Sequence, residues 1–493
     1  MTVDVDVVVV GAGPAGLLLA GDLARAGVSC MVLERRTERS PLTRAFTVHA
    51  RTLDELDARG VADELIALGT PVREFKLFGR TALDLTRLPS RFPYLLVTPQ
   101  YQTERVLEGR ARRAGADIHF GSEVTGVTQH SGAVEVRARL DGGPDRVMRA
   151  SWVVGADGMH SIVREALGMP FPGKPVVHSV MLAEVRLTQP PPIAMTINST
   201  GDSFALVAPF GDGFYRVIAW QRTDQPTDDA VPFSLAELSE VTRRAMGTDY
   251  GMHDPRWMSR FHSEERQVPR YRDGRVLLAG DAAHVHSPAG GQGMNTSIQD
   301  AANLGWKLAA TVQGWAPPGM LDSYHDERHP VGRRVLRNSN AMLRMMTVPS
   351  AFVGVRNTVT LASTRIPAMA RHLAGQISGE GIRYPAPPGA HPLAGRRVTD
   401  LRLADGRRLY EALRDGRFLL AAGPGALPDD VASGYGDRVE AVAIARDSGT
   451  VVLIRPDAYI AWAAAGGDAT APRIRASLVA WCGRPAQPVA QPA

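Results

Sequence analysis

Three glycines near the start of the chain, Gly11, Gly13 and Gly16, stand between an apolar run at residues 7–10 and a helical pattern. Strand, glycine turn and helix in this order are typical of a dinucleotide site. Gly11 permits the tight turn, Gly13 lets the backbone approach a pyrophosphate, and Gly16 lets the helix pack closely on the strand. The free N–H groups at the start of the helix then attract phosphates.

An acid follows at a distance that suits the same site. The next apolar run ends at Glu34, 18 residues after Gly16. A carboxylate about 20 residues beyond the glycines binds the ribose hydroxyls in such sites. It favours an adenosine ribose without a 2′-phosphate, so FAD or NAD over NADP. A glycine-rich turn in another kind of α/β protein is the alternative.

Two later stretches carry further polar turns. Asp157-Gly158 and Gly280-Asp281 each follow an apolar run, and the loop "PAGGQGMN" at 288–295 precedes a long helical pattern. A carboxylate at the end of a strand can hold a second set of hydroxyls. The glycine loop lets N–H groups approach a flat polar ring, and the positive end of the helix favours a ring with negative charge, as in a reduced flavin.

The elements that must position these turns fall into four stretches. Residues 1–171 alternate strands and helices, and 172–268 carry the alternation typical of antiparallel strands. Residues 269–385 return to a buried strand and long helices. A proline-rich stretch at 384–397 indicates a linker, and 390–493 indicates a further small α/β domain. At 493 residues the chain has room for several domains.

Composition argues against several classes of function. The net charge is only +5 and the arginines are scattered, so we expect no nucleic-acid partner. The two cysteines, Cys30 and Cys482, make no disulfide framework, which fits a reducing cytoplasm. The chain shows no signal peptide and no uninterrupted apolar run long enough to cross a bilayer, so we expect no membrane span.

The three motifs, in this order and spacing, resemble those of FAD-dependent aromatic hydroxylases of the para-hydroxybenzoate hydroxylase type, over residues 1 to about 385. "PQYQTERVL", "DSYHDERHPV" and the C-terminal extension resemble the branch of aromatic polyketide hydroxylases and rifampicin monooxygenases. The resemblance implies an α/β fold: a Rossmann-like FAD-binding domain (1–171 and 269–385), an inserted antiparallel-sheet substrate domain (172–268), and a thioredoxin-like C-terminal domain (390–493) without redox cysteines.

The resemblance also implies which residues hold FAD. They are Gly11, Gly13, Pro14, Ala15, Gly16, Glu34, Arg35, Arg44, Gln100, Asp281, Pro288, Gly291, Gly293, Met294 and Asn295. Glu34, with Arg35 beside it, would bind the adenosine ribose, and Arg44 would meet the phosphates. Gln100 would lie near the ribityl chain, a role for which Gln102 competes.

Three other polar residues have weaker assignments. Asp157 either braces the fold or touches FAD, and both remain open. His284 and His286 stand two residues apart with no third ligand nearby, so a structural role is favoured over a metal site. The resemblance implies no metal either.

The substrate should lie between the flavin loop and the sheet of 172–268. By strand alternation, Phe214, Arg216, Ile218 and Trp220 share one face. Arg216 is the one catalytic candidate, because it could orient a phenolate; an exposed sheet arginine paired with an acid is the favoured alternative. The pocket candidates, by composition alone, are Met181, Met195, Phe204, Phe210 and Met294.

The reaction that the resemblance implies is hydroxylation of a polycyclic phenol. NADPH or NADH would reduce the flavin, O2 would give a C4a-hydroperoxide, and a water-poor cavity would let the oxygen reach the ring. Inactivation of a rifampicin-type antibiotic, Baeyer–Villiger oxidation, and a flavin-binding protein without turnover are the alternatives. A homodimer is compatible with the sequence.

Overall fold

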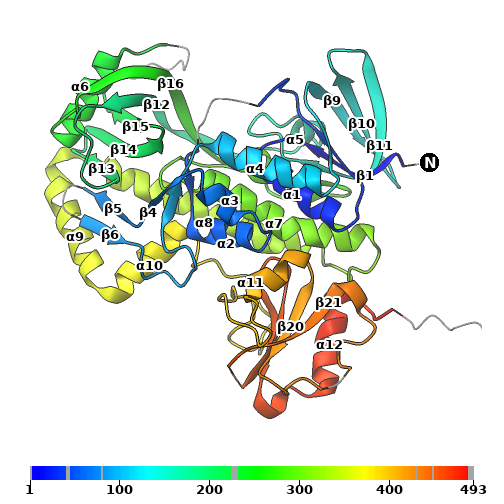
Figure 1. The fold of residues 1–493 in the computed structure, drawn as a ribbon. Helices are drawn as coiled ribbons and strands as arrows, with labels where there is room; N and C mark the ends of the chain where they lie inside the picture. Colours follow the sequence, from blue (N-terminus) through cyan, green and yellow to red (C-terminus); the bar gives the residue numbers. More distant parts are fainter. Residues whose placement is uncertain are drawn as a thin grey trace, which may run out of the picture.

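The protein is described by a computed structural model, and the structure describes residues 3–39, 45–78, 81–223, 231–428, 430–446 and 449–486. Figure 1 shows a parallel sheet flanked by long helices, a second sheet beside it, and a separate C-terminal unit below them.

The parallel sheet carries the predicted turns on one edge. Its strands run β17 (Arg272–Asp273), β18 (Val276–Leu278), β11 (Asp145–Gly155), β1 (Val5–Val10), β2 (Cys30–Leu33) and β8 (Asp117–His119). The pairs from β18 to β8 are parallel, and the last four residues of β1 are buried, as an all-apolar strand in a parallel sheet should be. The carboxyl ends of β1, β11 and β18 therefore bring Gly11, Asp157 and Asp281 to a common edge.

Helices cover this sheet, and a hairpin extends it, because its strand β10 (Val134–Leu140) pairs with β11. Helix α1 (Pro14–Arg25) packs between α4 (Gln100–Arg113) and α7 (Gly293–Val312). Strands β9 (Ser122–Gln129) and β10 form the antiparallel hairpin that their alternation predicts. Gly16 allows the close approach of α1, since a Cβ there would overlap the carbonyl oxygen of Gly11.

The second sheet is mostly antiparallel and larger than predicted. In order its strands are β19 (His284–Val285), β16 (Met252–Gln267), β12 (Gly173–Leu187), β15 (Phe214–Gln221), β14 (Ser203–Gly211), β13 (Met195–Ser199), β5 (Glu74–Leu77) and β6 (Thr81–Asp84). Residues outside 172–268 thus supply both edges, because β5 pairs with β13 and β19 with β16. Helix α6 (Leu235–Met246), capped by Ser234, covers one face.

Shorter elements join the two sheets. Strands β3 (Thr47–Val48), β7 (Leu95–Val97) and β4 (Thr70–Val72) form a small sheet, and α2 (Ala50–Asp57) and α3 (Ala62–Ile66) lie between β3 and β4 in the chain. Helix α5 (Ile162–Ala166) follows β11 and contacts β9 and β11 of the main sheet. The helical stretches predicted over 298–345 and 351–380 are helices α7, α8 (Ser323–Met346), α9 (Val353–Arg365) and α10 (Pro367–Ser378).

The C-terminal unit has its own sheet. Its strands are β21 (Val439–Ala443), β20 (Phe418–Ala422), β22 (Thr450–Ile454) and β23 (Ile460–Ala465), with α11 (Leu409–Ala412) and α12 (Ala471–Cys482) beside them. Phe418 packs edge-on against Trp306 of α7, with ring centroids 5.3 Å apart. The thioredoxin-like assignment of this unit stays a prediction. No helix in the described ranges combines the length and apolarity that a bilayer crossing needs.

Candidate active site

The first glycine turn leaves an open helix N-terminus. Gly11 has φ +103°, and a Cβ on it would overlap the carbonyl oxygen of Ala156. Gly13 is the N-cap of α1 and makes no side-chain capping bond, and a Cβ on it would meet no atom within 4 Å. Unsatisfied N–H groups facing open space are what a bound pyrophosphate requires, so the turn fits the phosphates of FAD.

Glu34 lies directly against this turn. Its Oε2 accepts a hydrogen bond from the Ala12 N–H at 2.8 Å, and its Oε1 accepts from Nε of Arg36 at 2.9 Å. Burial acts to raise the pKa of Glu34, but the bonds from Arg36 outweigh it and hold the pKa below its usual range. Arg35, predicted beside Glu34, is exposed, so Arg36 is the basic neighbour that the sequence analysis missed.

The Asp281 turn meets the Gly11 turn. Asp281 is exposed on a short 3-10 helix, Gly280–Ala282, after β18. A Cβ on Gly280 would lie 3.6 Å from Cβ of Ala15, at the start of α1. The carboxylate at the end of β18 and the phosphate-type turn at the end of β1 are therefore within reach of one extended ligand.

Asp157 braces this arrangement. Its Oδ2 accepts from the Val163 N–H at 3.3 Å, in the first turn of α5, and burial raises its pKa. Arg164, on the same helix, donates to the carbonyl of Ala282 at 3.1 Å. The second motif thus supports the Asp281 turn through α5.

The glycine loop is held by Asn295. Nδ2 of Asn295 donates to the carbonyls of Thr47 (2.9 Å) and Gly291 (2.8 Å), and Oδ1 accepts from the N–H of His49 (2.8 Å). Gly293 begins α7 with no side-chain capping bond from Gln292, so the N–H groups of a 20-residue helix are free at this point. That end of the dipole favours a ring with negative charge.

The other predicted FAD residues that the structure describes are divided between this loop and α4. Pro288 is exposed, and Met294 packs in the core below. Gln100 donates to Glu104 at 2.8 Å, whereas Oε1 of Gln102 is buried with no hydrogen-bond partner among the described residues. The choice between these two glutamines therefore stays open. Arg44 lies outside the described residues.

The two loop histidines have separate surroundings. His284 is fully buried, and its Nε2 lies 2.6 Å from Asp300. Nδ1 of His286 lies 2.8 Å from the Ser287 carbonyl, and burial lowers the pKa of His286 to about 4. Asp300 was missed by the sequence analysis.

Arg216 is buried, not exposed, which corrects the favoured alternative. Its Nη2 donates to Glu184 Oε1 at 2.5 Å, and its guanidinium lies 4.7 Å from the centroid of the Phe210 ring and 5.0 Å from that of Trp257. Burial lowers the pKa of Arg216 to about 10. The expected pairing with an acid holds, but aromatic side chains cover this face of the sheet.

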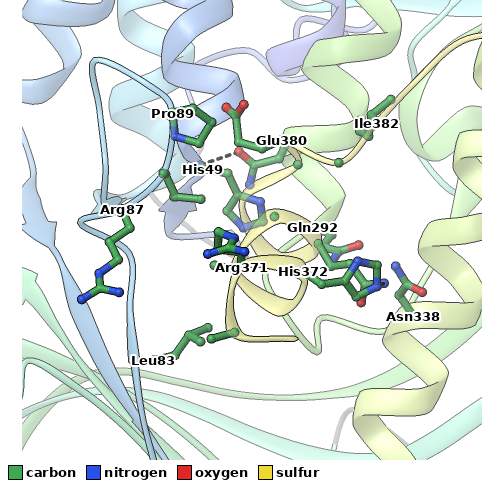
Figure 2. Close-up of a pocket in the computed structure, with 18 of the residues that line it drawn as sticks. His49, Leu83, Arg87, Pro89, Gln292, Asn338, Arg371, His372, Glu380 and Ile382 are labelled. Atoms are coloured by element: carbon green, nitrogen blue, oxygen red, sulfur yellow. Dashed lines mark hydrogen bonds between the residues drawn. The ribbon is translucent and has the colours of Figure 1, made fainter. Parts of the chain in front are cut away.

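A cavity of about 860 Å³ opens beside the glycine loop (Figure 2). Gln292 and Asn295 reach it from the loop and the start of α7, His49 from the end of β3, Leu83 from β6, and Arg371 from α10. None of the five predicted pocket residues lines it. They are distributed over separate apolar clusters: Met181 against α6, Phe204 beside Trp220, Met195 and Phe210 around Phe46, and Met294 in the main core.

Comparisons with known proteins identify the chain's relatives. Residues 4–339 match the family model described as an FAD binding domain, and 391–485 match an aromatic-ring hydroxylase C-terminal domain. The chain is 40% identical to rifampicin monooxygenase of Streptomyces venezuelae (93% of this chain, 95% of that one). It is 39% identical to the 12-dehydrotetracycline 5-monooxygenase/anhydrotetracycline 6-monooxygenase of Streptomyces rimosus (98% and 99%).

Solved structures agree with this result. CabE, an aromatic hydroxylase from angucycline biosynthesis, superposes with a TM-score of 0.85 at 38% identity, over 98% of this chain and 100% of that one. The matched models span both the sheet that carries the three turns and the C-terminal unit. The chain therefore belongs to the FAD-dependent aromatic hydroxylases of the para-hydroxybenzoate hydroxylase type, in the branch of aromatic polyketide hydroxylases and rifampicin monooxygenases.

Proposed function

We propose that the protein uses NADPH or NADH and O2 to hydroxylate a polycyclic phenol of the polyketide type. The close approach of the Gly280 turn to Ala15 at the start of α1 carries this proposal, because it brings the Asp281 carboxylate and the phosphate-type turn at Gly11 within the length of one FAD. Bound FAD would supply the redox chemistry. The chain supplies positioning and a partly enclosed space.

The roles of the binding residues follow from their surroundings. The turn at Gly11 to Gly16, with Pro14 and Ala15 at the start of α1, would hold the pyrophosphate, and Glu34 would hold the adenosine ribose. Asp281 would hold the ribityl side. The N–H groups at Gly293 to Asn295 would face the flavin ring, with Pro288 and Gly291 shaping the loop.

The finer architecture remains part of the proposal. We place the FAD-binding domain at 1–171 and 269–385, the substrate domain at 172–268 with β5 and β6 added to its sheet, and a thioredoxin-like domain at 390–493. A cytoplasmic location and a homodimer are proposed on the same footing.

The experiment measures cofactor, turnover and product together. The purified protein is loaded with FAD, and NADPH and NADH consumption is followed with and without polycyclic phenols such as anhydrotetracycline. The expected result is faster NAD(P)H consumption with the phenol and a product heavier by one oxygen atom. Failure to bind FAD, or NAD(P)H consumption that yields only hydrogen peroxide with every phenol, contradicts the proposal.

Rifampicin is the second substrate to test, because the chain is 40% identical to a rifampicin monooxygenase. An oxygen inserted between two carbons would indicate a Baeyer–Villiger outcome, which fragmentation of the product distinguishes from ring hydroxylation.

A further inference from the structure

The cavity beside the glycine loop has a neutral floor. His49 and Gln299 are 2% and 4% exposed, and both line it. Nε2 of His49 and Oε1 of Gln299 are buried with no hydrogen-bond partner among the described residues. Burial lowers the pKa of His49 to about 4, so this imidazole is uncharged at neutral pH. A buried polar atom without a partner is costly, and a ligand hydroxyl would satisfy it.

The middle of the cavity is apolar. Apolar side chains line it: Leu83 from β6, Val331 and Val335 from α8, Ala374 from α10, and Ile382 just after α10. Its volume of about 860 Å³ lies within the range of small-molecule pockets. A flat, polycyclic body suits such a space.

The mouth of the cavity is cationic. Four exposed arginines line it, and none of them has an acidic partner within ion-pair distance among the described residues. They are Arg87, Arg365, Arg371 and Arg383. In Figure 2, Arg87 lies at the left of the view and Arg371 lies near its middle.

The two acids of the lining are already engaged by other groups. Asp84 accepts from the N–H and hydroxyl of Thr86, and Glu380 pairs with Arg397. Asp84 keeps its charge and acts on Arg87 at a distance beyond ion-pair range, but four exposed arginines outnumber this one acid, so the mouth remains net positive.

We infer that this cavity takes the substrate as an elongated polycyclic acid, with a hydroxyl at Gln299 and His49 and a carboxylate or enolate at the arginines. The inference rests on the proposed function, since it names the substrate class of the same site. The phosphates of NADPH are a second source of negative charge, and the experiment separates the two.

The test for the mouth is equilibrium binding to the FAD-loaded protein without NADPH. The probes are anthraquinone-2-carboxylate and 2-(hydroxymethyl)anthraquinone, which share a shape and differ in charge. We expect the carboxylate to bind at least tenfold more tightly at low salt, with the difference shrinking as salt screens the arginines. Arg371→Gln and Arg87→Gln should each weaken the carboxylate severalfold and leave the neutral probe unchanged. Arg475→Gln, on the exposed face of α12, is the matched control.

The test for the floor uses a second pair of probes. Gln299→Met keeps the volume and removes the amide. It should weaken 6-hydroxyanthraquinone-2-carboxylate severalfold more than anthraquinone-2-carboxylate, and this ratio is insensitive to any general loss of folded protein. Equal loss for both probes would overturn the assignment of the floor.

Three results would overturn the inference for the mouth. These are equal affinity for the charged and neutral probes, arginine variants that weaken both alike, and arginine variants that raise the equilibrium Kd for NADPH without changing carboxylate binding. The last result would assign the charge to the nucleotide. None of them requires turnover, so failure of the hydroxylation assay with intact charge discrimination would count against the proposed function alone.

Discussion

The carboxylate of Asp300, on α7, accepts a hydrogen bond from the backbone N–H of Gly280 at 3.2 Å. The same Oδ2 lies 2.6 Å from Nε2 of His284, and Oδ1 accepts from Nε of Arg328 at 2.7 Å. One buried carboxylate therefore joins Gly280 and His284, which stand on either side of Asp281 in the chain, to Arg328 of α8. Burial acts to raise its pKa, but Arg328 and His284 outweigh this and keep it below the usual range.

Asp300→Asn should loosen the Asp281 turn. The variant keeps the shape but leaves Arg328, which is fully buried, without its counter-charge. Breaking such a pair costs about 3–5 kcal/mol. We expect the free energy of unfolding of the FAD-free protein to fall by about that amount, and FAD binding to weaken. Urea unfolding and a fluorescence titration with FAD check this.

The matched control is Asp326→Asn, in the exposed first turn of α8. It should leave both measurements unchanged. Asp300→Asn protein that binds FAD and unfolds like the parent protein would contradict the role of Asp300.

Substitutions at two glycines of the first turn should affect FAD binding and fold stability separately. Gly13 has φ −78° and ψ 179°, which any residue adopts, and faces open space. Gly13→Val should therefore change the free energy of unfolding without FAD by less than about 1 kcal/mol, yet block the pyrophosphate. Gly16→Ala should destabilise the fold itself by about 1–3 kcal/mol, because the new methyl group overlaps the Gly11 carbonyl. Thermal unfolding and FAD retention on gel filtration distinguish the two, and the reverse ranking would contradict the assignment.

The strand, turn and helix around Gly11 were predictable because the signal is local. An all-apolar strand, three glycines and a helical period leave few alternatives over a short stretch. The role of Asp300 was not predictable in this way. Its partner Gly280 lies 20 residues earlier, in another element, and the two meet only when α7 packs against the end of β18.

The surroundings of Arg216 and the lining of the cavity also depend on the tertiary fold and could not be predicted from local sequence. Alternation placed Arg216 on the correct face, with Phe214 and Ile218, but could not show that Phe210 and Trp257 cover that face. The cavity combines His49 and Leu83 with Arg371, which comes much later in the chain. No local pattern links them.

The buried His49 and the half-buried His286 should make the protein acid-sensitive. Burial lowers the pKa of His49 and of His286 to about 4, whereas the unfolded side chain titrates near 6.5. Below pH 6.5 the unfolded chain binds the protons and the folded one does not. The stabilisation is therefore complete above about pH 6.5 and is lost as the pH falls towards 4.

His286→Asn tests this dependence, since the amide can replace the Nδ1 donor to Ser287. The fall in unfolding free energy between pH 6.5 and 4 should be smaller than in the parent protein by up to about 3 kcal/mol. Urea unfolding at several pH values measures it. His372→Asn, on the exposed part of α10, should leave the pH profile as it is. An unchanged profile for His286→Asn would show that this histidine is not the group that titrates.

Glu327 of α8 makes one of the buried polar contacts between the C-terminal unit and the FAD-binding part. Its carboxylate accepts from Nη1 and Nη2 of Arg455 at 2.6 and 2.8 Å, and from Nζ of Lys307 at 2.8 Å. Arg455 also pairs with Asp457 at 2.5 Å. Burial acts to raise the pKa of Glu327, but Arg455 and Lys307 outweigh it and lower the pKa strongly. Glu327→Gln would leave two buried cations with a single acid.

We therefore expect Glu327→Gln to release the C-terminal unit before the rest unfolds. The cost of an uncompensated buried charge, about 3–5 kcal/mol, falls on the contact between the two parts. Trypsin should then cut within residues 384–397 faster than in the parent protein, and mass spectrometry of the fragments locates the cut. Asp468→Asn, an exposed change in the same unit, should not alter the rate. Equal cleavage rates for parent and Glu327→Gln, together with equal stability, would show that other contacts, such as Trp306 on Phe418 and the ion pairs of Asp57 with Arg408 and Arg414, hold the unit without this network.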